Sequence, residues 1–154
     1  MSTITENAAP AARKLDQLLA HYGQSHRNPR NERIHFVAIP LIMLSLLGLL
    51  SSAHPWLAYG FAGASLIYYA RLSLPVLLCM AAVSAVALAL VHAMGDWVLP
   101  ESAAIFVGAW IAQFVGHKIE GKKPSFFEDL QYLWIGPVFV LDKLLEKFTD
   151  KTIN

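Results

Sequence analysis

The sequence SHRNPRNERIHFVAIPLIMLSLLGLLSSA, residues 25–53, joins a polar segment directly to an apolar one. Its first twelve residues hold two histidines, two asparagines, a proline and three arginines, and the remainder is almost wholly apolar. The apolar part, residues 34–53, is long enough for a membrane helix, which needs roughly 20 such residues. The stretch therefore predicts a membrane-spanning helix that carries imidazoles and amides at its entrance.

The composition of the 154-residue chain also favours a membrane protein. Hydrophobic residues make up 56% of it and charged residues only 15%, whereas a soluble domain averages about 25% charged residues. The net charge of +1, with no basic segment interleaved with aromatics, argues against nucleic acid as a partner. A single cysteine, Cys79, excludes an intramolecular disulfide framework and a cysteine-rich zinc site.

Four apolar segments predict an all-α, polytopic membrane protein with four transmembrane helices. The expected spans are about 34–53, 56–70, 72–91 and 103–119. Pro40 should kink the first span without breaking it. Residues 1–11 are expected to form a disordered arm, and residues 12–150 a single helical membrane domain.

The positive charges indicate how the spans are oriented. With four crossings, all 12 Lys and Arg residues fall on one side, because the connections after the first and third spans carry none. The positive-inside rule then places both termini in the cytoplasm. The expected location is a bacterial inner membrane or an endoplasmic reticulum equivalent. The N-terminal segment lacks an apolar core typical of a signal peptide, so we expect no cleaved leader.

An amphipathic helix is predicted on the cytoplasmic face before the first span, ending near Gly23. Its apolar positions are spaced i, i+3, i+4 and i+7: Leu15, Leu18, Leu19 and Tyr22. Asn28 and Pro29 are typical of an N-cap and a first-turn proline, and they predict the start of the next helix.

Further helices are predicted after the fourth span, where Gly121 is a plausible C-cap. Ser125 and Glu128 form a capping box that would start a helix on the cytoplasmic face. After a Gly136–Pro137 break, an apolar stripe marks a second amphipathic helix: Val138, Leu141, Leu144, Leu145 and Phe148.

Four crossings bring distant histidines to the same cytoplasmic lip. His26 and His35 precede the first span, and His117 ends the fourth. Ionisable groups at membrane depth usually have a partner or a function, and imidazole is the commonest metal ligand. On one straight helix His26 and His35 would lie on opposite faces, so their convergence requires a bend, which Pro29 supplies.

One face of the fourth span carries further candidates at steps of 3, 4 and 3: Trp110, Gln113, His117 and Glu120. His117 and Glu120 could both reach one metal, and Gly116 would let another backbone come close. Histidines with a carboxylate suit Fe(II) and oxygen chemistry. Glu120 has a competing role as a helix-end charge that pairs with Lys122 or Lys123.

The remaining polar residues leave alternatives open. Asn31, four residues before His35, could hold the second nitrogen of that imidazole or bind substrate. His21 is a reserve ligand on the surface helix, while His54 and His92 fall on the opposite side of the membrane. The histidines could instead be merely interfacial, in a scaffold or lipid-binding protein, or they could bind a b-type haem.

Two patterns in the sequence resemble a known family. The first, Y-x-x-x-H-x-N-P-x-N-x-x-x-H, is met by Tyr22, His26, Asn28, Pro29, Asn31 and His35. The second, W-x-x-Q-F-x-G-H-x-x-E-G-x-x-P, is met by Trp110, Gln113, Phe114, Gly116, His117, Glu120, Gly121 and Pro124. Over about residues 13–148 the chain is similar to the 2-hydroxy fatty acid dioxygenases, small membrane proteins once catalogued as a domain of unknown function.

The resemblance implies an Fe(II)-dependent enzyme that uses O2 to shorten a long-chain 2-hydroxy fatty acid by one carbon, an α-oxidation. The family's required histidines match His26, His35 and His117, which would bind the iron, and Glu120 would join them in catalysis. Supporting or substrate-contacting roles would fall to Tyr22, Asn28, Asn31 and Gln113. Membrane lipid is the other expected partner, and the sequence leaves homo-oligomerisation open.

Overall fold

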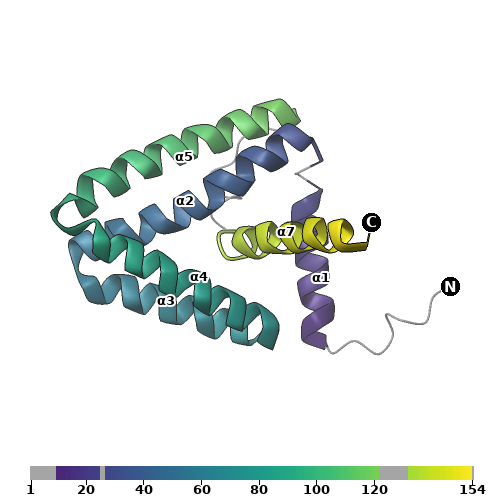
Figure 1. The fold of residues 1–154 in the computed structure, drawn as a ribbon, viewed down its shortest axis with the longest axis horizontal. Coiled ribbons are helices and arrows are strands. Elements are labelled where there is room, and N and C mark those ends of the chain that lie inside the picture. Colours follow the sequence, from purple (N-terminus) through teal and green to yellow (C-terminus); the bar gives the residue numbers. More distant parts are fainter. Residues whose placement is uncertain (1–9, 25–26, 122–131, 154) are drawn as a thin grey trace.

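The computed structural model describes the backbone of residues 10–24, 27–121 and 132–153, and the side chains of 14–24, 27–121 and 132–146. Every regular element in these ranges is helical, as predicted. The helices are α1 (Pro10–Gly23), α2 (Pro29–Ala53), α3 (Pro55–Ala70), α4 (Leu74–Ala93), the 3-10 turn η1 (Gly95–Trp97), α5 (Val98–Glu120) and α7 (Ile135–Ile153). In Figure 1, α2 lies beside α5 and α3 lies beside α4, while α7 lies between the two pairs.

The helix ends that the sequence predicts are confirmed. Asn28 is the N-cap of α2, and its side chain accepts a hydrogen bond of 2.9 Å from the Arg30 N–H. Gly121 ends α5 with φ of +75°, a left-handed conformation in which glycine has no Cβ to clash. Gly23 ends α1. Residues 10 and 11 of the predicted N-terminal arm are helical, and residues 1–9 lie outside the described residues.

Three described helical segments are long and apolar enough to cross a membrane: Pro29–Ala53, Leu74–Ala93 and Gly95–Glu120. The remaining predicted span corresponds to α3, whose 16 residues extend about 24 Å, less than the roughly 30 Å hydrocarbon core. The predicted fourth span, 103–119, begins too late, since α5 already begins at Val98. Pro100 is tolerated there because the first N–H groups of a helix have no intrahelical partner.

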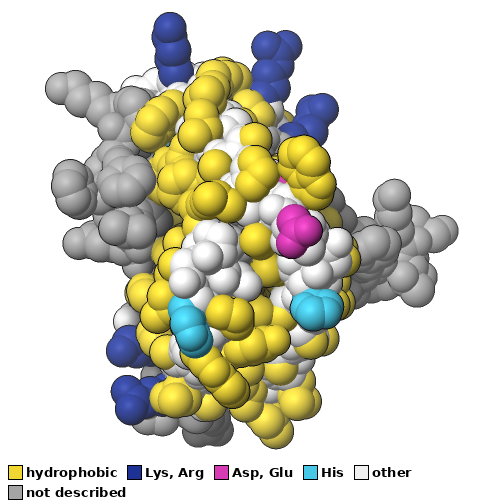
Figure 2. All heavy atoms as spheres, turned by 90° about the vertical axis from the view of Figure 1, so that its left-hand side faces the viewer, with side chains coloured by type: hydrophobic (Ala, Val, Ile, Leu, Met, Phe, Trp, Pro, Cys, Tyr) yellow, Lys and Arg dark blue, Asp and Glu magenta, His cyan; other side chains and the backbone are white. Residues whose placement is uncertain are grey.

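The two turns that link α2 to α3 and α4 to α5 lie at the same end of the molecule (Figure 1). Figure 2 views this end, which is mostly hydrophobic, with histidine and acidic side chains near its centre and Lys and Arg only at its margins. Neither turn contains Lys or Arg in the sequence. The start of α2 and the end of α5 lie at the opposite end, which is where the predicted site residues are found.

α2 and α5 form the most extensive helix pair. Ala38 and Ile42 of α2 pack against Ala109 and Trp110 of α5, and all four are buried. Deeper in the pair, a side chain at Gly48 would collide with Ser102. Small residues at this contact allow the two backbones to come close, as is usual between membrane helices.

α7 packs against α1 and against α2 of this pair. Val138 and Phe139 are buried with Tyr22 of α1 and Ile39 of α2. The predicted amphipathic stripe is therefore confirmed at Val138, while Leu145 is 55% exposed. The capping box at 125–128 and its helix lie outside the described residues, as does the side chain of residue 148.

The segment before α7 is tied to α3 by two hydrogen bonds. The hydroxyl of Tyr69 donates to the Trp134 carbonyl at 2.9 Å, and the Trp134 indole N–H donates to the Ser65 hydroxyl at 2.8 Å. These bonds link Trp134 to two residues of α3 that are distant from it in the sequence. They hold the start of α7 close to α3.

Candidate functional site

His35 of α2 and His117 of α5 lie side by side at the polar end of the helix pair. Their ring centroids are 5.2 Å apart and the rings are nearly perpendicular, at 86°. His35 is fully buried and His117 is 6% exposed. The two histidines that the topology brings to one lip are thus in direct ring contact.

A main-chain contact fixes the protonation of His35. Its Nδ1 lies 3.0 Å from the carbonyl oxygen of Asn31. Because a carbonyl only accepts hydrogen bonds, Nδ1 of the neutral ring carries the proton and Nε2 carries the lone pair. This is the arrangement found in metal-binding histidines. Asn31 was predicted either to hold a nitrogen of this imidazole or to bind substrate, and its backbone carbonyl makes the first of these contacts.

The carboxylate of Glu120 binds the N-terminus of α2. It accepts hydrogen bonds from the N–H groups of Arg27 at 3.0 Å and Asn28 at 3.0 and 3.2 Å, and from the Asn31 side-chain amide at 2.9 Å. An anion at this position also complements the helix dipole. Glu120 therefore connects the end of α5 to the start of α2. Its alternative partners, Lys122 and Lys123, lie outside the described residues.

Gly116 allows the two helices to meet at the site. A Cβ at this position would collide with the Asn31 side-chain oxygen and would lie 3.1 Å from Cε1 of His35. The atoms that come close at Gly116 belong to side chains of α2, whereas the sequence prediction was that a neighbouring backbone would approach. The glycine thus keeps His35 and Asn31 within reach of α5.

We expect Gly116→Ala to destabilise the protein by about 1–3 kcal/mol through overpacking. Alanine in a helix interior is otherwise favoured over glycine by about 1 kcal/mol. Gly108→Ala is the matched control on α5, because no atom lies within 4 Å of its added Cβ. Thermal unfolding should show a lower stability for Gly116→Ala and an equal or higher stability for Gly108→Ala, and equal changes in the two variants would contradict the close contact.

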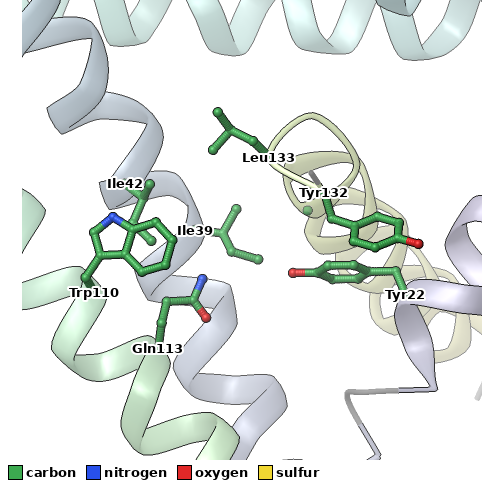
Figure 3. A pocket seen from close by; sticks show the side chains of 8 residues that line it. Tyr22, Ile39, Ile42, Trp110, Gln113, Tyr132 and Leu133 are labelled. Atoms are coloured by element: carbon green, nitrogen blue, oxygen red, sulfur yellow. The ribbon is translucent and has the colours of Figure 1, made fainter. Parts of the chain in front are cut away.

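A small cavity, shown in Figure 3, is lined by Ile39 and Gln113, which lie one helical turn from His35 and His117. It measures about 20 Å³, room for about one water molecule. Tyr22 and Gln113 both direct their polar ends into it, and Ile39, Ile42 and Trp110 form apolar walls. Gln113 is 4% exposed, and its side-chain oxygen has no hydrogen-bond partner among the described residues. Such a group is available to a ligand.

The other candidate ligands are less well placed. His21 is exposed on α1 and its ring lies 5.6 Å from that of Tyr132, on the side of the molecule near α7. His26, the third predicted ligand, lies outside the described residues. Within the described ranges no three His, Cys, Asp or Glu side chains are close enough to hold one metal ion. The described part of the site therefore supplies the pair His35 and His117.

Sequence reasoning did not identify the cavity-lining residues that precede α7, Tyr132 and Leu133. Neither belongs to a motif or to a periodic pattern that would have marked it. Tyr22 and Gln113, in contrast, were predicted as supporting or substrate-contacting residues, and both line this cavity.

Comparison with known proteins identifies a family and a relative to which the chain is similar. A family model described as Mpo1-like, 2-hydroxy-palmitic acid dioxygenase Mpo1-like, matches residues 12–148. The 2-hydroxy-palmitic acid dioxygenase MPO1 of Saccharomyces cerevisiae is 29% identical over 140 residues, which cover 86% of this chain and 80% of the yeast protein. No solved structure matches the chain.

Proposed function

The chain belongs to the Mpo1-like family of 2-hydroxy-palmitic acid dioxygenases. We propose that it converts a long-chain 2-hydroxy fatty acid and O2 to the one-carbon-shorter fatty acid, CO2 and water, with Fe(II) at its histidines. The observation that carries the proposal is the buried pair His35 and His117, with the proton of His35 fixed on Nδ1. Two neighbouring imidazoles at the headgroup end of an apolar helix pair suit an amphiphilic substrate.

The residues fit an iron ion. His35 presents the lone pair of Nε2, and His117 lies against it in the same buried site. These two residues, together with His26, would hold the iron, and histidine ligation with open positions is typical of Fe(II) sites that use oxygen. When bound, iron would supply the activation of O2.

The chain's own groups would bind and orient the substrate. The amide of Gln113 and the hydroxyl of Tyr22 face the cavity and can hydrogen-bond the carboxylate or the 2-hydroxyl group. Asn31 fixes the His35 ring through its carbonyl. The walls formed by Ile39 and Trp110 are apolar, and a low local polarity strengthens these polar contacts.

We further propose four membrane crossings, with both termini in the cytoplasm and α3 as the shortest span. α3 pairs with α4 along the bundle (Figure 1), and it exposes Trp56, Leu57 and Ile67 on its outer surface. α3 is shorter than the hydrocarbon core is thick, and local thinning of the bilayer accommodates such a difference. Four crossings also account for the absence of Lys and Arg from the two turns at the far end.

The proposal predicts O2 consumption by the purified protein after anaerobic loading with Fe(II). With 2-hydroxyhexadecanoic acid we expect one pentadecanoic acid formed per O2 consumed, measured with an oxygen electrode and mass spectrometry. Hexadecanoic and 3-hydroxyhexadecanoic acids are the matched controls and should give no shortened product, because neither has a hydroxyl beside its carboxylate. Absence of product from 2-hydroxy acids of every length tested would favour a scaffold.

A further inference from the structure

A second and much larger cavity lies between α2, α4 and α7. It measures about 430 Å³, within the range of about 300–1,000 Å³ typical of small-molecule sites. Ser84 is the only described lining residue whose side chain is polar. Each of the three helices contributes lining residues: Met43 and Leu47 from α2, Val83 and Ala87 from α4, and Val140 and Leu144 from α7.

The two cavities lie near each other where α7 begins beside α2. Ile39 and Gly136 line the small cavity, and the residues that follow them, Pro40 and Pro137, line the large one. A Cβ at Gly136 would lie 3.2 Å from Cδ1 of Ile39, so α7 packs closely on α2 at this point.

The large cavity extends along the helices, away from the histidines. Its α4 wall reaches from Met80 to Leu90, about 15 Å along the helix axis. Its α2 wall reaches from Pro40 to Leu47 in the same direction (Figure 1). The shape is therefore an apolar slot that starts beneath α7 and runs toward the bilayer interior.

We propose that this slot binds the alkyl chain of the 2-hydroxy acid while the carboxylate and hydroxyl lie at Gln113 and the histidine pair. A molecule with one polar end and one long apolar chain suits a polar site that lies close to an apolar slot. A charged head could not enter the slot without losing its hydration, since burial of an unpaired charge is strongly unfavourable. The inference rests on the proposed function, and it assigns Ala87 and Leu90 to the control of chain length.

Photo-crosslinking tests the slot without requiring turnover. The probe is a 2-hydroxy acid with a diazirine near its terminal methyl, added to the full chain in phosphatidylcholine vesicles. We expect labelled peptides at Ala87 or Met43, and labelling that unlabelled 2-hydroxyhexadecanoic acid prevents. Labelling confined to outward-facing Val107 and Ile111 of α5, or labelling that extra phospholipid suppresses equally well, would overturn the assignment.

Ala87→Phe tests the slot through substrate preference. We expect the ratio of turnover for 2-hydroxyhexadecanoic over 2-hydroxyoctanoic acid to fall roughly tenfold or more, because the larger side chain shortens the slot. Ala85→Phe is the control, since Ala85 is exposed and does not line the cavity. An unchanged ratio, or equal losses for both acids, would overturn the slot. If the wild-type protein shortens no acid, the proposed function fails and the crosslinking result still decides the slot.

Discussion

Replacing His117 with alanine is expected to abolish both the iron bound per chain and the turnover of 2-hydroxy acids. His117 is buried against the His35 ring at a centroid distance of 5.2 Å. Its loss would leave a single described imidazole, which cannot hold Fe(II) with the affinity of a multi-histidine site. Metal analysis of detergent-purified protein, followed by O2 uptake, measures both effects.

His92→Ala is the matched control, because His92 is exposed on α4 near the turn at the opposite end of the molecule. Its iron content and turnover should equal those of the wild type. Stoichiometric iron and normal turnover in His117→Ala would refute the proposed site. Zinc instead of iron in the wild type would retain a metal site but remove the basis for oxygen chemistry.

The elements that position this site were largely predictable from local sequence. Asn28 predicts the start of a helix because its side chain can cap the first N–H groups, and Pro29 because its φ is fixed near the helical value. Gly121 predicts the end of a helix because glycine can adopt a positive φ. Once the chain crosses an even number of times, His35 and His117 must lie at the same end. Their contact follows from topology rather than from sequence distance.

The partners of Glu120 could not be predicted in the same way. Spacing shows that Glu120 shares a face of α5 with His117, and it therefore suggested a shared metal. Which donors the carboxylate meets depends on the axial offset between α2 and α5, and that offset is set by side-chain packing at Gly116 and Gly48. The unsatisfied N–H groups at the start of α2 were a usable signal, because they require an acceptor.

The apolar slot was equally hidden from sequence patterns. The lining residues of α2 and α4 lie in nearly continuous apolar runs, so a residue facing a cavity looks the same as one facing lipid. Only the position of α7, held by Trp134 to Ser65 and Tyr69 of α3, separates the two environments. Sequence patterns therefore predict the polar residues at the end of the helix pair, whereas the apolar space beneath them is determined by packing.

Glu120→Ala is expected to destabilise the protein by about 3 kcal/mol, since hydrogen bonds to a charged group contribute about 1.5–3 kcal/mol each and do not add fully. The variant leaves the N–H groups of Arg27 and Asn28 and the Asn31 amide without this acceptor. Because Asn31 also fixes His35, we expect iron affinity to fall by about 10–100-fold. Thermal unfolding and iron titration measure the two effects.

The result for Glu120→Ala distinguishes a residue that positions α2 from one that binds the metal. If Glu120 positions α2, excess Fe(II) should restore turnover in Glu120→Ala, and the visible spectrum of the iron-loaded variant should match that of the wild type. Glu101→Ala, which alters an exposed carboxylate in the first turn of α5, should change neither stability nor iron affinity. A spectrum that shifts in Glu120→Ala at saturating iron would instead place the carboxylate on the metal. The hydrogen bonds from Asn28 and Asn31 favour the first result, because they occupy both carboxylate oxygens.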